Sequence, residues 1–451
     1  MHVELLNIPL PEDLLKLKWH GNFKLMSEMI DIRIQKDIPQ QLKDRLLLEK
    51  EIIRRLPADF IYTKNQAIAL CQHELYDFTA EEFDELFKDN AFEFLFVEGI
   101  MKFKDNFFDN LIKSRPIYQK RLKHNRLLQE DRDEIIEHIK KKKDVYYRFH
   151  VKMAIKIKPQ YEEIGKRVRV WLPLPLVMSP VEAMKVIKTS SPQAVINDDT
   201  VLQRSVYFEE ILQHDQEFAV EFEIYSHVHD RDLTAKTSLP VNMNEYLQEC
   251  QPHIVFTPYL KQLTKSVVGN TSDPLQKAKR IYDYITSHIT YSFVRSYLTL
   301  PCLSEYMATA MKGDCGIYAI LFITLCRIAG IPATWQSGLY CTPQHISNHD
   351  WAMFYVEPYG WLHCDCSFGG SGFRHGSDRQ RQFYFGHIDP FRIPFAGAFM
   401  QELVPPKKFI RRDPFDHQTG EIEYDYRAIN EYEYDMHQTI IEAEEINKTH
   451  E

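Results

Sequence analysis

A single cysteine occupies a position in the chain where a nucleophile would be favoured. Cys315 follows Gly313-Asp314 and opens a run, Ile317 to Ala329, that is apolar on nearly every side. Such a run predicts a helix buried in a core, with Asp314 as its N-cap and Gly330 as its stop. In a first helical turn, free N–H groups and the helix dipole favour thiolate, the nucleophilic form of cysteine. The alternative is a buried structural cysteine, a common role of this residue type.

The base that such a nucleophile needs, and the group that orients the base, lie in one predicted hairpin. Its arms run from His349 to Val356 and from Trp361 to Cys366, joined by a Pro/Gly turn at 357–360. If Tyr355 pairs with Trp361, His349 and Asp365 share one face as diagonal neighbours, about 7–8 Å apart at the backbone. A register shifted by one residue would separate them. The pattern therefore predicts His349 as base and acid, oriented by Asp365.

Each member of this constellation has a structural alternative. His349 could be a surface histidine at a strand end, Asp365 could cap the turn at 367–370, and His363 is a rival base on the face of Asp365. A zinc site is a further alternative; its candidate ligands are Cys341, His345, His349, His363, Cys364 and Cys366. Against zinc, no CxxC pair occurs, and Cys364 and Cys366 face away from Asp365. We therefore expect no metal and no cofactor. The glycines at 369–372 indicate either a flexible loop or close approach of a substrate backbone.

Four segments are expected to position these residues. Residues 1–144 carry helical spacing and predict a helical domain without chemistry of its own. Residues 145–228 alternate apolar and polar side chains, which predicts a small antiparallel β domain. Residues 229–425 read as helices followed by antiparallel strands, an α+β catalytic domain. Residues 426–451 form a tail that we expect to be helical.

Composition excludes some classes of function. The chain has 451 residues and a net charge of -9, which argues against nucleic-acid binding. No stretch approaches the roughly 20 apolar residues of a membrane span, and no signal peptide is visible at Met1-His2-Val3-Glu4. Eight irregularly spaced cysteines are typical of a reducing compartment. We therefore expect a cytoplasmic protein without nucleic-acid or membrane partners.

The motifs resemble a known family. Gly313-x-Cys315 with its helix into Arg327-Ile328-Ala329-Gly330-Ile331-Pro332, then His349-x-Trp351, then Gly360-Trp361 with Asp365, resemble the bacterial form of the transglutaminase-like core. The resemblance extends over about 250–425 and includes Phe383 to Arg392 and Asp416 to Glu421. It implies a papain-like fold, in which a helix that begins with the cysteine packs on an antiparallel sheet carrying histidine and aspartate.

The activity implied by this resemblance is acyl transfer through a thioester on Cys315, with a Cys-His-Asp catalytic triad and a peptide or protein substrate. Hydrolysis of a peptide or amide bond by a cysteine protease is the preferred form. The alternatives are a protein-glutamine amine transferase that cross-links, and a non-catalytic binding protein. The oxyanion would take the backbone N–H of Cys315 and a second donor. Animal transglutaminases use an upstream tryptophan, and between Met101 and Cys315 this chain has only Trp171, in the β domain; Tyr291 is our substitute, with Trp351 and Gly316 as further oxyanion or substrate candidates.

Overall fold

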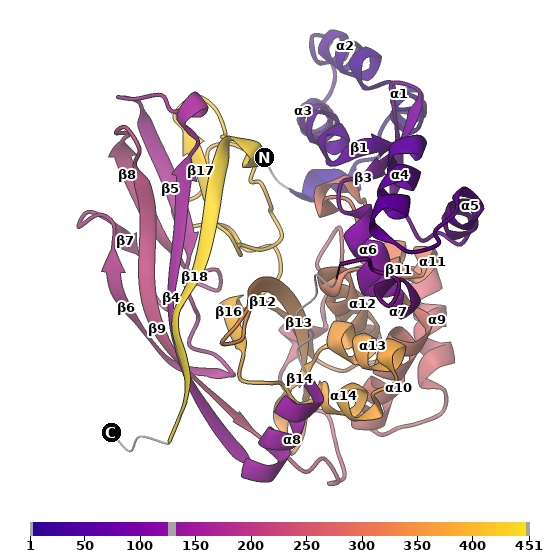
Figure 1. The fold of residues 1–451 in the computed structure, drawn as a ribbon, viewed down its shortest axis with the longest axis vertical. Helices are drawn as coiled ribbons and strands as arrows, with labels where there is room; N and C mark the ends of the chain where they lie inside the picture. Colours follow the sequence, from indigo (N-terminus) through magenta and orange to yellow (C-terminus); the bar gives the residue numbers. More distant parts are fainter. Residues whose placement is uncertain (1–2, 125–131, 448–451) are drawn as a thin grey trace.

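The structure is a computed structural model that describes residues 3–124 and 132–447. A β-sandwich forms one side of the molecule and helices form the other, with a five-stranded sheet between them (Figure 1). The fold class is therefore the predicted α+β class with antiparallel sheets.

The N-terminal segment consists of helices around a small sheet. Its helices are α1 (Glu12–Trp19), α2 (Phe23–Ile34), α3 (Gln40–Arg55), α4 (Lys64–Glu74), α5 (Ala80–Lys88), α6 (Phe107–Ser114) and α7 (Pro116–Gln119). The next helix, α8 (Arg132–Lys142), lies apart from them and packs Ile136 and Ile139 into the core of the β domain (Figure 1). β1 (Phe60–Thr63), β2 (Phe94–Val97) and β3 (Ile100–Lys104) form an antiparallel sheet in the order β1-β3-β2. The purely helical prediction for residues 1–144 misses this sheet, because strands of four or five residues show too few positions for a period to stand out.

The β domain is a sandwich of two four-stranded sheets. Its strands are β4 (Asp144–Ile157), β5 (Arg167–Pro173), β6 (Val181–Thr189), β7 (Val195–Ile196), β8 (Ser205–Ile211), β9 (Glu217–His229), β17 (Glu421–Tyr424) and β18 (Tyr434–Ile446). The strand orders are β17-β5-β8-β7 and β18-β4-β9-β6. Inward side chains of both sheets, such as Val151, Phe222, Val168 and Phe208, share one buried cluster. The domain predicted at 145–228 thus needs two strands from the C-terminal end of the chain.

The predicted helical tail is wrong, because β18 pairs antiparallel with β4 along its whole length, from Tyr434 opposite Ile157 to Ile446 opposite Tyr146. Arg148 of β4 forms ion pairs with Glu442 at 2.7 Å and with Glu444 at 2.8 Å. An acidic segment of this composition is compatible with a helix in isolation. The tail is a strand because it pairs with β4, almost 300 positions earlier in the chain, and the contacts of Arg148 with Glu442 and Glu444 are part of that pairing.

The C-terminal half contains the helices and the sheet that carry the site. Its helices are α9 (Pro258–Val268), α10 (Pro274–His288), α11 (Leu303–Ala310), α12 (Cys315–Ile328), α13 (Cys366–His375) and α14 (Asp378–Phe383). Its five-stranded sheet has the order β15-β14-β13-β12-β16, made of β12 (Ala333–Cys341), β13 (Ile346–Val356), β14 (Gly360–Cys364), β15 (Phe385–Gly386) and β16 (Arg392–Ala396). Two short parallel strands, β10 (Thr290–Tyr291) and β11 (Lys312–Gly313), lead the chain to α12.

The central helix is buried as the sequence predicts. Every side chain from Gly316 to Cys326 is buried, and Phe322 packs edge-on against Phe354 of β13, with ring centroids 5.8 Å apart. Gly330 has a φ of +81°, the left-handed conformation in which glycine ends a helix without strain. Because α12 is held on all sides, the residue at its first position is held as well.

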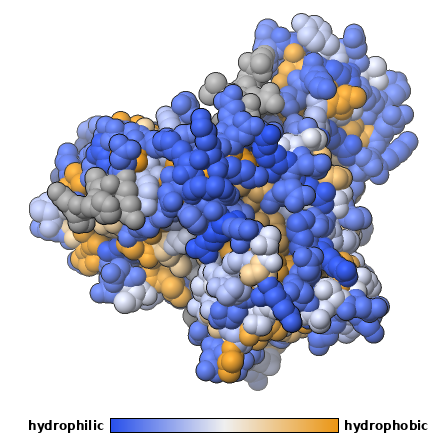
Figure 2. All heavy atoms as spheres, turned by 90° about the horizontal axis from the view of Figure 1, so that it is seen from below, coloured by the Kyte–Doolittle hydropathy of each residue, from blue (hydrophilic) through white to orange (hydrophobic). Residues whose placement is uncertain are grey.

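The face of the molecule seen in Figure 2 is mainly polar. Seen from below, hydrophilic residues dominate, and apolar ones form small separate groups (Figure 2). Across the described residues, no helix combines the length and apolar character needed to cross a membrane.

Candidate active site

Cys315 is the first residue of α12. The Asp314 side chain accepts a hydrogen bond from the Ile317 backbone N–H at 3.4 Å, which caps the helix as predicted. Cys315 itself is partly exposed, whereas Cys326 at the other end of the helix is buried. Cys315 therefore lies on a rigid element without being sealed inside the core.

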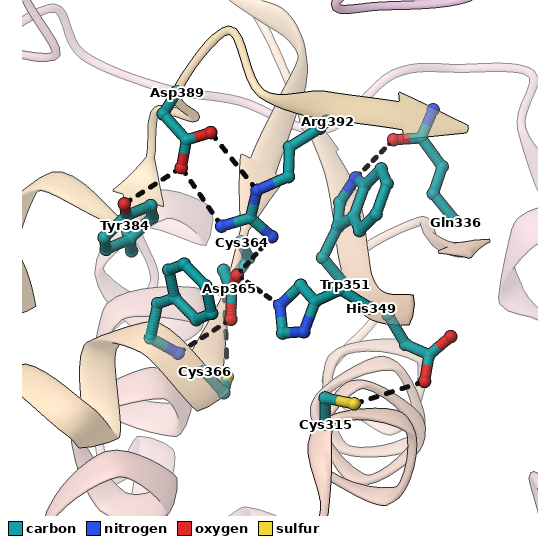
Figure 3. Close-up of polar contacts among 12 residues, drawn as sticks. Cys315, Gln336, His349, Trp351, Cys364, Asp365, Cys366, Tyr384, Asp389 and Arg392 are labelled. Carbon is teal, nitrogen blue, oxygen red and sulfur yellow. Dashed lines mark hydrogen bonds and ion pairs between the residues drawn. The ribbon is translucent and has the colours of Figure 1, made fainter. Parts of the chain in front are cut away.

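The hairpin has the predicted register. Tyr355 pairs with Trp361 and Met353 pairs with His363, which places Asp365 directly after β14 and close to His349 of β13. His349 Nε2 lies 2.8 Å from Asp365 Oδ2, and both side chains are buried. Figure 3 shows the imidazole between the Asp365 carboxylate and the Cys315 thiol, with its second ring nitrogen on the side of the sulfur. The structure thus brings the three predicted residues to one place.

The side chain of Asp365 has three partners, and it both orients His349 and caps the segment that follows, which the sequence presented as alternatives. Its Oδ1 accepts a hydrogen bond from the Phe368 N–H at 2.8 Å, which caps α13, and its Oδ2 also contacts Arg392 Nη1 at 2.8 Å. Burial opposes ionisation, but the positive charges of His349 and Arg392 outweigh it and hold the pKa of Asp365 well below its ordinary value. The carboxylate is therefore charged throughout the physiological range.

Arg392 anchors the carboxylate from within the core. Its side chain is fully buried, pairs with Asp389 at 3.1 Å, and stacks 4.2 Å above the Phe368 ring. Tyr384 Oη donates to Asp389 at 2.9 Å, which completes the chain of contacts in Figure 3. Sequence reasoning missed this role of Arg392. The signal was present, since Arg392 stands between the apolar residues Phe391 and Ile393 and follows Asp389 at i,i+3 spacing.

His349 is set to be neutral. Burial lowers its pKa below the ordinary 6.5, and this effect exceeds the opposing pull of the Asp365 carboxylate. The ring lies 4.7 Å from the Phe368 ring and stacks parallel to Trp351 at 6.2 Å. Since Nε2 is engaged by Asp365, Nδ1 is the nitrogen that can exchange a proton with Cys315.

The sequence favours a thiolate at Cys315, whereas the surroundings in the structure favour the neutral thiol. Burial, followed by the Asp350 and Asp314 carboxyls, raises the pKa of Cys315 well above its ordinary value. Cys315 Sγ donates to Asp350 Oδ2 at 3.4 Å (Figure 3). The helix N-terminus favours thiolate, but two nearby carboxyls and low solvation outweigh it. Without substrate, the pair is therefore a neutral thiol and a neutral imidazole.

Asp350 belongs to a group of carboxyls that sequence reasoning also missed. Burial and the Asp314 carboxyl raise the pKa of Asp350 to about 8, and burial raises the pKa of Asp413 and, more strongly, of Asp416. Gln418 Nε2 donates to Asp350 Oδ1 at 2.8 Å. At neutral pH Asp350 therefore retains its proton, and it faces the sulfur mainly as an uncharged acid.

The three further candidates have different surroundings. Tyr291 is buried, and its hydroxyl accepts a hydrogen bond from Lys113 Nζ at 3.2 Å, which leaves its own proton available. The indole N–H of Trp351 is already taken by Gln336 Oε1 at 2.6 Å. A Cβ on Gly316 would lie 2.3 Å from Tyr297 Oη, so only glycine fits beneath that ring.

The alternatives considered for this region have structural explanations. His363 Nε2 contacts Ser179 Oγ at 2.9 Å, and burial lowers the pKa of His363 to about 3. Gly369 lies inside α13, where an added Cβ would fall 1.7 Å from Tyr282 Oη, so it serves helix packing and not a loop. No group of three or more His, Cys, Asp or Glu side chains suited to a metal ion occurs in residues 3–124 and 132–447.

The order of these elements matches a described family. Residues 261–366 match the model of the transglutaminase-like superfamily, and the matched region includes Cys315, His349 and Asp365. These residues form a transglutaminase-like core. The core ends at the first residue of α13, so Arg392 lies beyond the matched region.

Individual relatives of this core are distant. An uncharacterized protein of Haemophilus influenzae is 26% identical over 152 residues, which are 28% of this chain and 40% of the relative's length. Among solved structures, a proposed cysteine protease from Cytophaga hutchinsonii aligns with 68% of this chain and 92% of its own, at 14% identity and a TM-score of 0.42. The periplasmic domain of TgpA from Pseudomonas aeruginosa aligns with 55% of this chain and 96% of its own, at 12% identity and a TM-score of 0.28.

Proposed function

We propose that this protein is a cysteine hydrolase that cleaves a peptide or amide bond through a thioester on Cys315. The observation that carries the proposal is the 2.8 Å contact between His349 and Asp365, on the hairpin that faces the first turn of α12. A nucleophile, a base and a group that orients the base are the minimum set for this chemistry.

In the first half-reaction, His349 Nδ1 removes the proton from Cys315 Sγ as the sulfur attacks the substrate carbonyl carbon. Before substrate binds, the Cys315 thiol and the His349 imidazole are both neutral, so the site does not have to hold two poorly solvated charges. Asp365 stabilises the imidazolium that forms during the attack. The tetrahedral intermediate places negative charge on the carbonyl oxygen. It collapses as His349 gives its proton to the leaving amine, which departs and leaves an acyl group on the sulfur.

In the second half-reaction, His349 takes a proton from water, whose oxygen attacks the thioester carbon. The carbon–sulfur bond breaks, the acid product leaves, and Cys315 regains its proton. The oxyanion of each step takes the backbone N–H of Cys315, because amides in the first helical turn have no intrahelical partner. Tyr291 is the proposed second donor, since its hydroxyl proton is not engaged by Lys113.

The test uses the full-length protein and a quenched fluorescent peptide library, with and without a dansylated alkylamine. Release of new carboxyl ends supports hydrolysis, whereas incorporation of the amine supports transamidation instead. Cys315→Ala and His349→Ala should each reduce turnover by roughly 1,000-fold or more. Cys326→Ala, a buried cysteine of the same helix, is the matched control. Equal turnover by Cys315→Ala and the parent protein would refute the proposal.

The cytoplasmic location also remains a proposal, based on cysteine usage. Fractionation of source cells with an antibody to this chain tests it. Recovery with the periplasmic or secreted fraction would contradict the proposed location.

A further inference from the structure

Two cations lie against Tyr291, which pairs with the strand that precedes the proposed nucleophile, and one of them comes from the N-terminal segment. Lys113 of α6 places its Nζ 3.2 Å from Tyr291 Oη and 4.6 Å from the Tyr291 ring centroid. Tyr291 pairs with Gly313 across β10 and β11, two positions before Cys315. Cys315 and Asp314 are accordingly among the groups whose charge acts on Lys113.

The second cation lies over the same aromatic ring. Arg374 of α13 has its guanidinium carbon 5.6 Å from the Tyr291 ring centroid. Its Nε and Nη1 are buried and have no hydrogen-bond partner among the described residues. Since an unsatisfied buried donor costs about 1–3 kcal/mol, and more when charged, these atoms are poised for an acceptor from outside the chain.

Neither cation forms a close ion pair with a carboxylate of the described residues, although the Asp314 carboxyl acts on Lys113 from a greater distance. Across residues 3–124 and 132–447, the ion pairs include none with Lys113 or Arg374, in a chain whose net charge is -9. Burial, together with the charges of Arg132 and Arg374, lowers the pKa of Lys113. Positive charge is therefore concentrated here at an energetic cost, which an incoming anion would relieve.

Access from solvent is open on the lysine side. The side chain of Lys113 is exposed along part of its length, although its ammonium lies among neighbouring side chains; Arg374 and Cys315 are partly exposed, and the tyrosine between the two cations is buried. A lysine supplies a mobile point charge, and an arginine supplies a rigid fork of donors; together they suit a carboxylate. The site for such a group adjoins Tyr291, the proposed second oxyanion donor.

We propose that Lys113 and Arg374 form a subsite for a substrate carboxylate, so that the preferred substrates are acidic peptides. A role in substrate selection depends on the proposed function, but the first experiment tests the anion site without depending on that function. The carboxylate belongs either to an aspartate or glutamate side chain or to the free C-terminus of a peptide. The N-terminal segment, for which the sequence indicated no chemistry, thus contributes to substrate selection.

The first experiment compares alkylation of Cys315 by iodoacetate and by iodoacetamide, followed by peptide mass mapping in the full-length protein. In both reactions the sulfur loses its proton, forms a bond to carbon and displaces iodide. The relevant difference is that iodoacetate carries a negative carboxylate, whereas iodoacetamide is neutral. The parent protein should favour iodoacetate, and Lys113→Gln should lower the ratio of the two rates by about threefold or more, less so in high salt. Lys120→Gln, an exposed lysine nearby in the chain, should leave the ratio unchanged.

An unchanged ratio in both Lys113→Gln and Arg374→Gln would overturn the subsite, whether or not the protein turns over any peptide. Circular dichroism of each variant confirms folding, and the lysine variant alters only an exposed residue. The second experiment compares kcat/KM for peptides with an acidic side chain, with a free C-terminus, or with neither. Preference for either acidic series supports the subsite and identifies the source of the carboxylate. Equal cleavage of all three contradicts it, while no cleavage at all contradicts the proposed function instead.

Discussion

Arg392 Nη1 lies 2.8 Å from Asp365 Oδ2, the same oxygen that His349 Nε2 contacts from the other side. The arginine is fully buried, and it also holds Asp389. Its charge lowers the pKa of both Asp365 and His349. Arg392 therefore acts as a positioning residue that keeps the carboxylate ionised and the imidazole neutral.

Replacing Arg392 by lysine should weaken both stability and turnover. A single ammonium group cannot reach two carboxylates with the geometry of a guanidinium, so one of them loses its partner. We expect a loss of about 2–3 kcal/mol in the free energy of unfolding, as for buried hydrogen bonds to charged groups. Chemical denaturation measures this loss, and Arg379→Lys, whose arginine is exposed and pairs with Glu137, is the control.

The same variant should change the pH profile. As the positive charge moves away from Asp365, the pKa of His349 rises, and the acid limb of kcat/KM should shift to higher pH. A stability loss without any shift of the acid limb would show that Arg392 is only structural.

Asp365→Asn tests the orientation of the imidazole. Asparagine keeps the shape of the side chain but loses the charge that stabilises the imidazolium, and its amide nitrogen cannot accept from either partner. We expect kcat to fall by about 100-fold or more. Asp389→Asn makes the same change at a carboxylate that contacts Arg392 and Tyr384 but not His349, and should cost less. Equal kcat values for Asp365→Asn and the parent protein would exclude Asp365 from the proposed triad.

Local patterns were sufficient to predict the positions of His349 and Asp365. The period of the strands and the Pro/Gly turn define the register, and the register alone places these two residues together. The cap at Asp314 and the buried helix after it are equally local. These features depend on neighbours within about twenty positions, which a sequence pattern contains.

Features that depend on distant parts of the chain were not predicted. Lys113 reaches Tyr291 across 178 positions, and the last strand, β18, pairs with β4, which lies almost 300 positions earlier in the chain. The charge state of Cys315 was misjudged for the same reason. Asp350 lies 35 positions away, and its protonation depends on Asp416, on a third segment. Periodicity carries no information on such contacts.

Asp350→Asn should make Cys315 more reactive in alkaline solution. The pKa of Asp350 is raised to about 8, so above that pH the carboxylate is charged and opposes formation of the neighbouring thiolate. Asparagine stays neutral, so the variant's rate of alkylation by iodoacetamide should rise at lower pH than the parent's. Below about pH 7 the two proteins should differ little. Asp109→Asn, in α6, is the control, and coinciding pH profiles would show that Asp350 does not act on the sulfur.

Asp416→Asn should flatten the dependence of stability on pH. Burial and the neighbouring Asp413 and Asp350 carboxyls raise the pKa of Asp416 well above the 3.8 of the unfolded chain. Between these two values the folded state binds more protons, so the parent loses stability as pH rises, by up to about 1.4 kcal/mol per pH unit for one proton. The asparagine variant removes this contribution and should lose less stability between pH 6.5 and 8.

Denaturant unfolding at several pH values in that window measures the difference. Buried histidines with a lowered pKa, such as His253 and His417, have the opposite effect on stability. Their contribution to the free energy of unfolding is lost only as pH falls below about 6.5, so the window avoids it. Asp198→Asn is the control, since the pKa of that exposed carboxyl lies below 3.8 and its contribution is constant above pH 5. If Asp416→Asn and Asp198→Asn show the same slope as the parent protein, the buried carboxyls beside Cys315 do not retain their protons.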